Sequence, residues 1–159
     1  DEAAIAGVIG GAFGGDGEAL LVDRLRAAGA LDCSLVAEAG GEVGGHVALS
    51  PVIIDGQAGH GRWLGLAPLA VAADHRRHGL GRHLVERALA AAADRHATLV
   101  FVLGRPAYYA DLGFEEAAPL GWQCVYEVPS AAFRVWRPGP AADLPVTGTV
   151  RYHQAFDSL

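Results

Sequence analysis

The stretch LGLAPLAVAADHRRHGLGRHLVERAL, residues 64–89, decides the fold that we expect. Its first part belongs to a nearly all-apolar run over 63–72, which is typical of a strand buried at the centre of a sheet. Pro68 lies inside this strand and cannot donate a ladder hydrogen bond, so it indicates an edge, a bulge or a place where strands separate. The second part predicts a long helix over 79–96, because one stripe is apolar at helical spacing: Leu80, Leu84, Val85, Ala88, Leu89 and Ala92.

The connection between this strand and this helix has the composition of a phosphate-binding turn. It reads Arg76-Arg77-His78-Gly79-Leu80-Gly81, and Arg82 follows. A helix N-terminus presents unpaired N–H groups and a positive dipole to an anion. The two glycines let the backbone approach that anion and the arginines add charge, which favours a diphosphate ligand. A glycine-containing turn into a helix is also common for structural reasons alone, and this one matches neither the P-loop nor the GxGxxG fingerprint.

The remaining patterns predict the order of the other elements. We expect helices over 1–13 and from Asp16 to Gly29, followed by strands over 34–38 and 43–54 joined by a turn at 39–42. A strand over 98–103, a helix over 107–112 ended by Gly113, and strands over 122–128 and 133–137 come next. In the tail over 138–159 we expect Tyr152 and Phe156 to dock on the body. Hairpin-linked strands with one strand–helix–strand crossover indicate an α+β fold with a mixed, mostly antiparallel sheet. We expect one domain over 1–159.

Composition excludes several classes of function. A formal net charge of -6 argues against nucleic-acid binding, which requires a basic surface. No apolar run reaches the roughly 18 residues of a membrane span, so we expect no membrane partner. Cys33 and Cys124 are far apart, as expected for thiols in a reducing cytoplasm. His75, His78 and His83 lack the spacing and partners of a metal site, so we expect no metal.

A second motif follows the strand at 98–103. It reads VLGRPAYYADLGF over 102–114 and places Tyr108 and Tyr109 before Gly113 and Phe114. Two aromatic residues packing a short helix would explain it structurally. Together with the turn at 76–81, however, this order of elements resembles the GNAT superfamily of N-acetyltransferases. The stretches 36–52, 124–129 and 148–156 are similar to its YhbS-like bacterial branch in particular.

The resemblance implies an α/β/α fold with helices on both faces of the sheet and acetyl-CoA as the cofactor. It also implies a V-shaped gap between the two central strands, which holds the pantetheine arm. The pyrophosphate would then lie on the turn, at Arg76, Arg77, His78, Gly79, Leu80, Gly81 and Arg82. The pantetheine arm would lie along the preceding strand, at Leu69, Ala70 and Val71. Tyr108 would line the cofactor site. The family's first strand normally precedes the first helix, and we expect it to be absent from this sequence.

The chemistry that the resemblance implies is direct attack of an amine on the thioester. Tyr109 occupies the family position of the general acid, and a phenol with a pKa of about 10 stays protonated at neutral pH. The central strand contains no carboxylate to act as base. His46 is our first candidate for the base because histidine titrates near neutral pH, although it is also explained as a hydrogen-bonded sheet residue. Glu38, His60 and a chain of waters remain alternatives.

The sequence thus predicts a cytoplasmic acetyl-CoA-dependent N-acetyltransferase acting on a primary amine of a small molecule or peptide. The resemblance also implies a possible homodimer, since homodimers are common in the family. Two alternatives stay open at this point: a module that binds acetyl-CoA or another acyl-CoA as a sensor or partner subunit without catalysis, and a structural domain without a cofactor.

Overall fold

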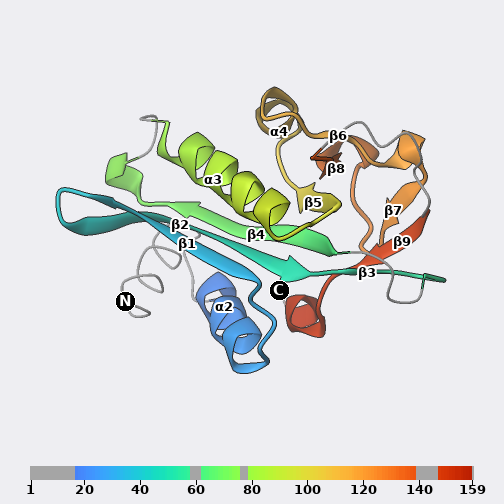
Figure 1. Cartoon of the computed structure of the whole chain (residues 1–159), viewed down its shortest axis with the longest axis horizontal. Helices are drawn as coiled ribbons and strands as arrows, with labels where there is room; N and C mark the ends of the chain where they lie inside the picture. Colours follow the sequence, from blue (N-terminus) through green and yellow to red (C-terminus); the bar gives the residue numbers. More distant parts are fainter. Residues whose placement is uncertain (1–16, 58–61, 76–78, 139–146, 159) are drawn as a thin grey trace.

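The computed structural model describes residues 17–57, 62–75, 79–138 and 147–158 (Figure 1). The predicted helix over 1–13 lies outside these residues. The helices are α2 (Gly17–Ala27), α3 (Leu80–Asp94) and α4 (Pro106–Asp111). The strands are β1 (Cys33–Ala39), β2 (Glu42–Pro51), β3 (Ile53–Ile54), β4 (Trp63–Val71), β5 (Leu99–Leu103), β6 (Glu115–Glu116), β7 (Trp122–Cys124), β8 (Phe133–Trp136) and β9 (Gly148–Arg151). The described residues also form four short 3-10 helices: η1 (Ala73–His75), η2 (Ala118–Leu120), η3 (Ser130–Ala132) and η4 (Gln154–Ser158).

The main sheet has six strands in the order β1-β2-β4-β5-β8-β6. Its neighbours pair antiparallel except β4 and β5, which are parallel and are connected through α3. The predicted mixed, mostly antiparallel sheet with one crossover is therefore confirmed. The predicted hairpin turn at 39–42 is also present, since Gly40 and Gly41 have φ angles of 61° and 82° that suit a two-residue turn.

The prediction of one strand over 43–54 is wrong. β2 ends at Pro51, which has no N–H to extend the ladder. The Val52 N–H then donates to the Trp63 carbonyl at 2.9 Å, and the two residues of β3 pair with β9 instead. The chain thus leaves the main sheet and enters a second one.

The second sheet has three strands in the order β3-β9-β7. The predicted strand over 122–128 is too long, because β7 ends at Cys124 and the four residues of β9 offer it no longer partner. The description of 138–159 as a tail is likewise wrong for 148–151, which form β9. The expected docking of Tyr152 and Phe156 on the body is confirmed, since both side chains are buried. β6 was not predicted; its two exposed residues give no strand pattern.

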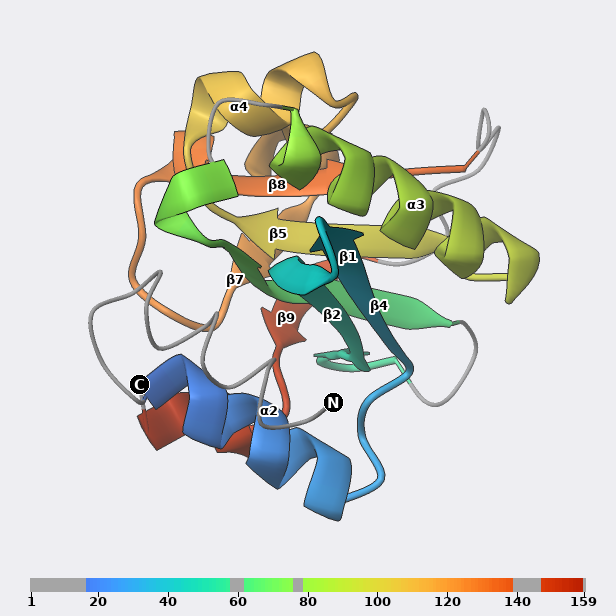
Figure 2. The same ribbon diagram turned by 90° about the vertical axis from the view of Figure 1, so that its left-hand side faces the viewer.

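Helices cover both faces of the main sheet, as predicted. Figures 1 and 2 show α3 and α4 on one side and α2 with η4 on the other. The predicted apolar stripe of α3 packs on the sheet, with Leu84, Val85 and Ala88 fully or almost fully buried. On the opposite face α2 contributes Leu21 and Leu25 to a second core that includes the aromatic residues of β7, β8 and the C-terminal segment.

Candidate active site

The two central strands separate partway along β4. Residues 63–65 of β4 pair with 99–101 of β5, and the register ends there. Beyond Gly65, β4 remains paired with β2 while β5 remains paired with β8. The predicted V-shaped gap is therefore present, and Gly65 marks its vertex.

A bulge lies on β4 just beyond this vertex. Val47 of β2 faces Leu69, but Leu49 faces Leu66, so one residue of β2 stands opposite two residues of β4. The second of those two is Pro68, which cannot donate to the ladder. The bulge that the sequence predicted at this proline is confirmed, and it re-aims the last three residues of the strand.

The residues assigned to the pantetheine arm follow the bulge directly. Leu69 and Val71 are half-buried, whereas Ala70 is buried and faces His46 across the ladder. Leu69 packs against the core beneath α3. Their position on β4 inside the gap fits the assigned role, which stays a prediction.

The start of α3 has the backbone geometry of an anion cradle. Gly79 is the N-cap residue with φ 75° and ψ 9°, a left-handed conformation that favours glycine. A Cβ atom on Gly81 would lie 2.8 Å from the Tyr108 hydroxyl and 3.4 Å from Val71 Cγ2. Gly81, Tyr108 and Val71 therefore converge at the helix N-terminus, where only glycine leaves the backbone accessible. These residues fit a coenzyme A diphosphate.

The charged part of the turn is described only in part. Arg76, Arg77 and His78 lie outside the described residues. The Arg82 guanidinium is exposed and forms an ion pair with Glu86 one turn along α3, with Nε 2.8 Å from Oε1. Leu80 turns its side chain toward Gly45 of β2, so only its backbone N–H is suited to bind an anion.

Tyr108 and Tyr109 point in different directions from α4. Tyr109 is buried, with its ring at 89° to that of Tyr108 and at 76° to that of Phe114, at centroid distances of 5.0 and 5.5 Å. A Cβ on Gly104 would lie 2.3 Å from the Tyr109 ring, so the ring rests on backbone that must be glycine. Burial, with a smaller contribution from Tyr108, raises the Tyr109 pKa to about 12. The phenol therefore stays protonated and can donate a proton, as its predicted role requires.

His46 lies on the face of the sheet opposite Tyr109 and α3, and it is completely buried. Its Nε2 is 2.8 Å from the Ser34 hydroxyl, and its Nδ1 has no hydrogen-bond partner among the described residues. Burial, followed by the nearby Arg26 charge, lowers the His46 pKa to about 4. The imidazole is therefore neutral at pH 7 and holds a lone pair beside Ala70, but its basicity is low.

The other candidates for the base are less well placed. Glu38 is exposed and faces Val43 near the hairpin turn, four residues along β2 from Val47, the partner of Leu69. At about 3.3 Å per residue this is roughly 13 Å from the strand position assigned to the pantetheine arm. His60 lies outside the described residues.

Two buried hydroxyl groups near the vertex were missed by the sequence reasoning. Ser50 faces Gly65 in the ladder, and Tyr152 lies against the same glycine, since a Cβ there would be 2.6 Å from Tyr152 Cε1. Neither hydroxyl has a hydrogen-bond partner in the described part of the chain. Seven consecutive residues of β2 are buried, so apolar and polar residues do not alternate along the strand. Nothing in the sequence therefore marks Ser50 as a candidate site residue. Tyr152 is 87 positions from Gly65 in sequence and reaches it only through the fold.

A metal site would require several His, Cys, Asp or Glu side chains close together. In the described ranges, no three His, Cys, Asp or Glu side chains are grouped so that they could hold a metal ion. His78 and the side chain of His75 lie outside those ranges. None of the described helices is long and apolar enough to cross a membrane.

Comparison with known proteins agrees with this geometry. The family model of the Acetyltransferase (GNAT) domain matches residues 30–116. The chain is similar to the uncharacterized N-acetyltransferase YhbS of Escherichia coli K12, with 41% identity over 146 residues, 91% of this chain and 86% of that protein. The chain belongs to the GNAT family of acetyltransferases.

Two solved structures show the same likeness in three dimensions. The structure of Escherichia coli YhbS in complex with CoA matches with a TM-score of 0.93 and 39% identity, over 99% of this chain and 87% of that one. A GNAT family acetyltransferase from Brucella melitensis in complex with acetyl-CoA matches with a TM-score of 0.81 and 38% identity, over 99% and 92% of the two chains.

Proposed function

We propose that this protein binds acetyl-CoA in the gap between β4 and β5 and transfers the acetyl group to a primary amine. The observation that carries the proposal is the separation of the two strands beyond Gly65, next to a helix N-terminus with Gly79 in the left-handed conformation. The complexes of the two relatives with CoA and acetyl-CoA support it.

The chain offers backbone groups at both ends of the cofactor. The N–H groups of Gly79, Leu80 and Gly81, with the helix dipole, suit the diphosphate, and the arginines of the turn suit its charge. The backbone of residues 69–71 runs along the gap and suits the amide groups of the pantetheine arm. An N–H group from Leu69 or Val71 would stabilise negative charge on the thioester oxygen during transfer.

Acetyl transfer joins the acceptor nitrogen to the acetyl carbon and breaks the carbon–sulfur bond. Tyr109 is the proton donor for the departing sulfur, because its phenol is protonated at neutral pH and lies on α4 at the end of β5. The phenolate that forms recovers a proton from solvent. Because the Tyr109 pKa is about 12, the protonated phenol is strongly favoured at neutral pH and is restored before the next turnover.

The proton that the amine loses goes to a neutral acceptor on the opposite face of the sheet. His46 Nδ1 is that acceptor in our proposal, either directly or through water, because it is neutral and has no partner among the described residues. Its low pKa makes it a weak base, which suits relay of the proton to water more than permanent uptake.

Neither cysteine suits a covalent acetyl-enzyme. Cys33 is buried in the core beneath α3. Burial raises the pKa of the half-buried Cys124 thiol, so little of it is thiolate at neutral pH. Both observations support direct attack by the amine over a cysteine-bound intermediate.

Calorimetric titration with acetyl-CoA and with CoA tests the cofactor site. We expect micromolar binding of both by the wild-type chain. Gly81→Glu brings bulk against Tyr108 and negative charge to the diphosphate, so we expect the Kd of acetyl-CoA to rise by about 30-fold or more, roughly 2 kcal/mol. Arg87→Glu makes a matched control, since it adds an acidic residue to the exposed face of α3, two turns from the N-terminus.

Equal affinity in Gly81→Glu and wild type would place the diphosphate elsewhere. Failure of the wild-type chain to bind either ligand would overturn the proposed function itself. The cytoplasmic location and a homodimer stay predictions that size-exclusion and localisation experiments address separately.

A further inference from the structure

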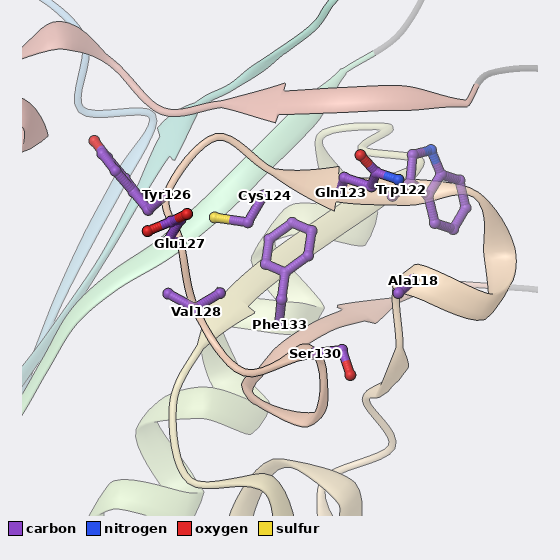
Figure 3. Close-up of a pocket in the computed structure, with 9 residues that line it drawn as sticks. All are labelled: Ala118, Trp122, Gln123, Cys124, Tyr126, Glu127, Val128, Ser130 and Phe133. Atoms are coloured by element: carbon purple, nitrogen blue, oxygen red, sulfur yellow. The ribbon is translucent and has the colours of Figure 1, made fainter.

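A cavity of about 180 Å³ lies beside the second sheet (Figure 3). It is formed by β7, the segment that follows it, and parts of η2, η3 and β8. Every residue that lines it lies beyond residue 116, where the match to the GNAT family model ends. An apolar cavity of about 150 Å³ is large enough to bind benzene, so this one has room for a group the size of a single ring.

The walls of the cavity combine apolar surface with a carboxylate. Trp122, Val128 and Phe133 supply the apolar surface. Tyr126 and the exposed Glu127 add polar groups, and Figure 3 shows them toward the opposite end from Trp122. Such a wall suits a ligand with an apolar body and an amine, because the carboxylate attracts the protonated amine from solvent.

Tyr152 connects this cavity to the vertex of the gap. Its ring stacks on Tyr126, a cavity residue, with centroids 6.1 Å apart and an interplanar angle of 21°, and it also lies against Gly65. Burial raises the Tyr152 pKa well above its usual range, and Cys124, Tyr126 and Tyr109 add to the effect. The Tyr152 ring therefore lies between Tyr126, a residue of the cavity wall, and Gly65 at the vertex of the gap.

The state of this hydroxyl points to a ligand. Tyr152 is 8% exposed, and its hydroxyl has no hydrogen-bond partner among the described residues. A buried hydroxyl without a partner has lost its hydrogen bonds to water, and a ligand that pairs with it would restore one. The Tyr152 hydroxyl is buried, and an ammonium group would have to lose its hydration to reach it, so the group that pairs with it is the neutral amine.

We propose that the cavity is the acceptor subsite and takes a primary amine carried on an apolar body about the size of one ring, whose neutral amine donates a hydrogen bond to Tyr152 Oη. This inference rests on the proposed acetyl transfer and names its acceptor class. Glu127 attracts the amine at the outer end, the apolar walls hold its body, and the uncharged inner end admits only the free base, which is the form that attacks a thioester.

Thiol release in the presence of acetyl-CoA tests the subsite with benzylamine, spermidine and a lysine-containing hexapeptide as probes. We expect kcat/KM for benzylamine to exceed that of the two larger amines by about tenfold or more. Val128→Trp fills the cavity and should lower kcat/KM for benzylamine by about tenfold, whereas Ile53→Trp adds the same bulk at an exposed site on β3 and should leave it unchanged.

Tyr152→Phe keeps the ring against Gly65 and removes only the hydroxyl. We expect the KM for benzylamine to rise about fivefold, the effect of one lost hydrogen bond, while the Kd of acetyl-CoA stays as in wild type. This variant keeps the proposal testable if Val128→Trp does not fold.

The outcomes separate this inference from the function on which it rests. Efficient acetylation of spermidine or the peptide, with benzylamine ignored, would overturn the subsite and leave acetyl transfer standing. Unchanged benzylamine kinetics in both folded variants would do the same. Absence of acetyl-CoA binding in calorimetry would overturn acetyl transfer and the subsite together.

Discussion

The two sides of the gap are built from the chain in opposite ways. The proposed cofactor side comes from nearly continuous sequence: β4, the segment 76–79 of the sequence and the start of α3, with Tyr108 and Tyr109 a little further on. The proposed acceptor side is assembled from distant parts, namely His46 and Ser50 on β2, β7 with the loop after it, and Tyr152 beside β9. In our proposal, local sequence therefore encodes the binding of a common cofactor, whereas the site for the acceptor depends on long-range contacts.

The two sides also differ in how their polar groups are satisfied. The buried side-chain atoms without a partner in the described residues include His46 Nδ1, Ser50 Oγ and Tyr152 Oη, and these three lie on the acceptor side. Buried polar groups are normally paired, so such a concentration indicates a face that completes its hydrogen bonds with a ligand or water. The cofactor side presents backbone N–H groups at a helix end instead.

The largest expected effect comes from Tyr109, the proposed general acid on the cofactor side. Tyr109→Phe keeps the ring on Gly104 but removes the proton donor, so we expect kcat to fall by about 100-fold or more while the Kd of acetyl-CoA changes little. Steady-state kinetics with calorimetry on the same preparation measures both. A variant with the wild-type kcat would exclude Tyr109 as the acid and make its burial purely structural.

A smaller effect concerns the pH dependence of stability, through His46 on the acceptor side. Its folded pKa of about 4 lies below the ordinary value of 6.5, so the unfolded chain takes up the proton first as the pH falls. The stability that the neutral imidazole contributes is present above about pH 6.5 and is lost on the way to about pH 4. A shift of this size corresponds to roughly 3 kcal/mol.

The measurement compares unfolding free energies in urea at about pH 7.5 and about pH 4.5. His46→Gln removes the titrating ring, so it should lose less stability over this interval than wild type; the carboxylates titrate in both and cancel. Identical losses in the two proteins would show that His46 is open to solvent and can be protonated in the folded state.

The smallest expected effect tests the contact between the vertex and the C-terminal segment. Gly65→Ala places a Cβ 2.6 Å from Tyr152 Cε1 and 3.1 Å from Val52 Cγ1, so we expect it to destabilise the fold by about 1–3 kcal/mol. In Tyr152→Leu, a shorter side chain leaves room for the methyl group. Unfolding free energies of both single variants and the double variant should therefore be non-additive. Strict additivity would place the Tyr152 ring away from Gly65.

Much of the fold was predictable because its signals are local. The apolar stripe of α3, the glycine pair at 40–41 and the bulge at Pro68 follow from periodicity and backbone geometry. The errors lie where partners are distant. Nothing near 53–54 or 122–124 indicates that β9, from the end of the chain, pairs with both. For the same reason Tyr152 appeared only as an aromatic residue of a docking tail.

The sequence by itself determined the family, the order of the central elements and the glycines at the start of α3, because turns, caps and periodic faces depend on residues close together in the chain. Only the tertiary structure decided that β3, β7 and β9 form a second sheet, that a cavity opens beside it and that the Tyr152 ring lies against Gly65 with its hydroxyl buried. The physical reason is that burial and unpaired hydrogen-bonding groups are properties of contacts between distant segments, which no local pattern specifies.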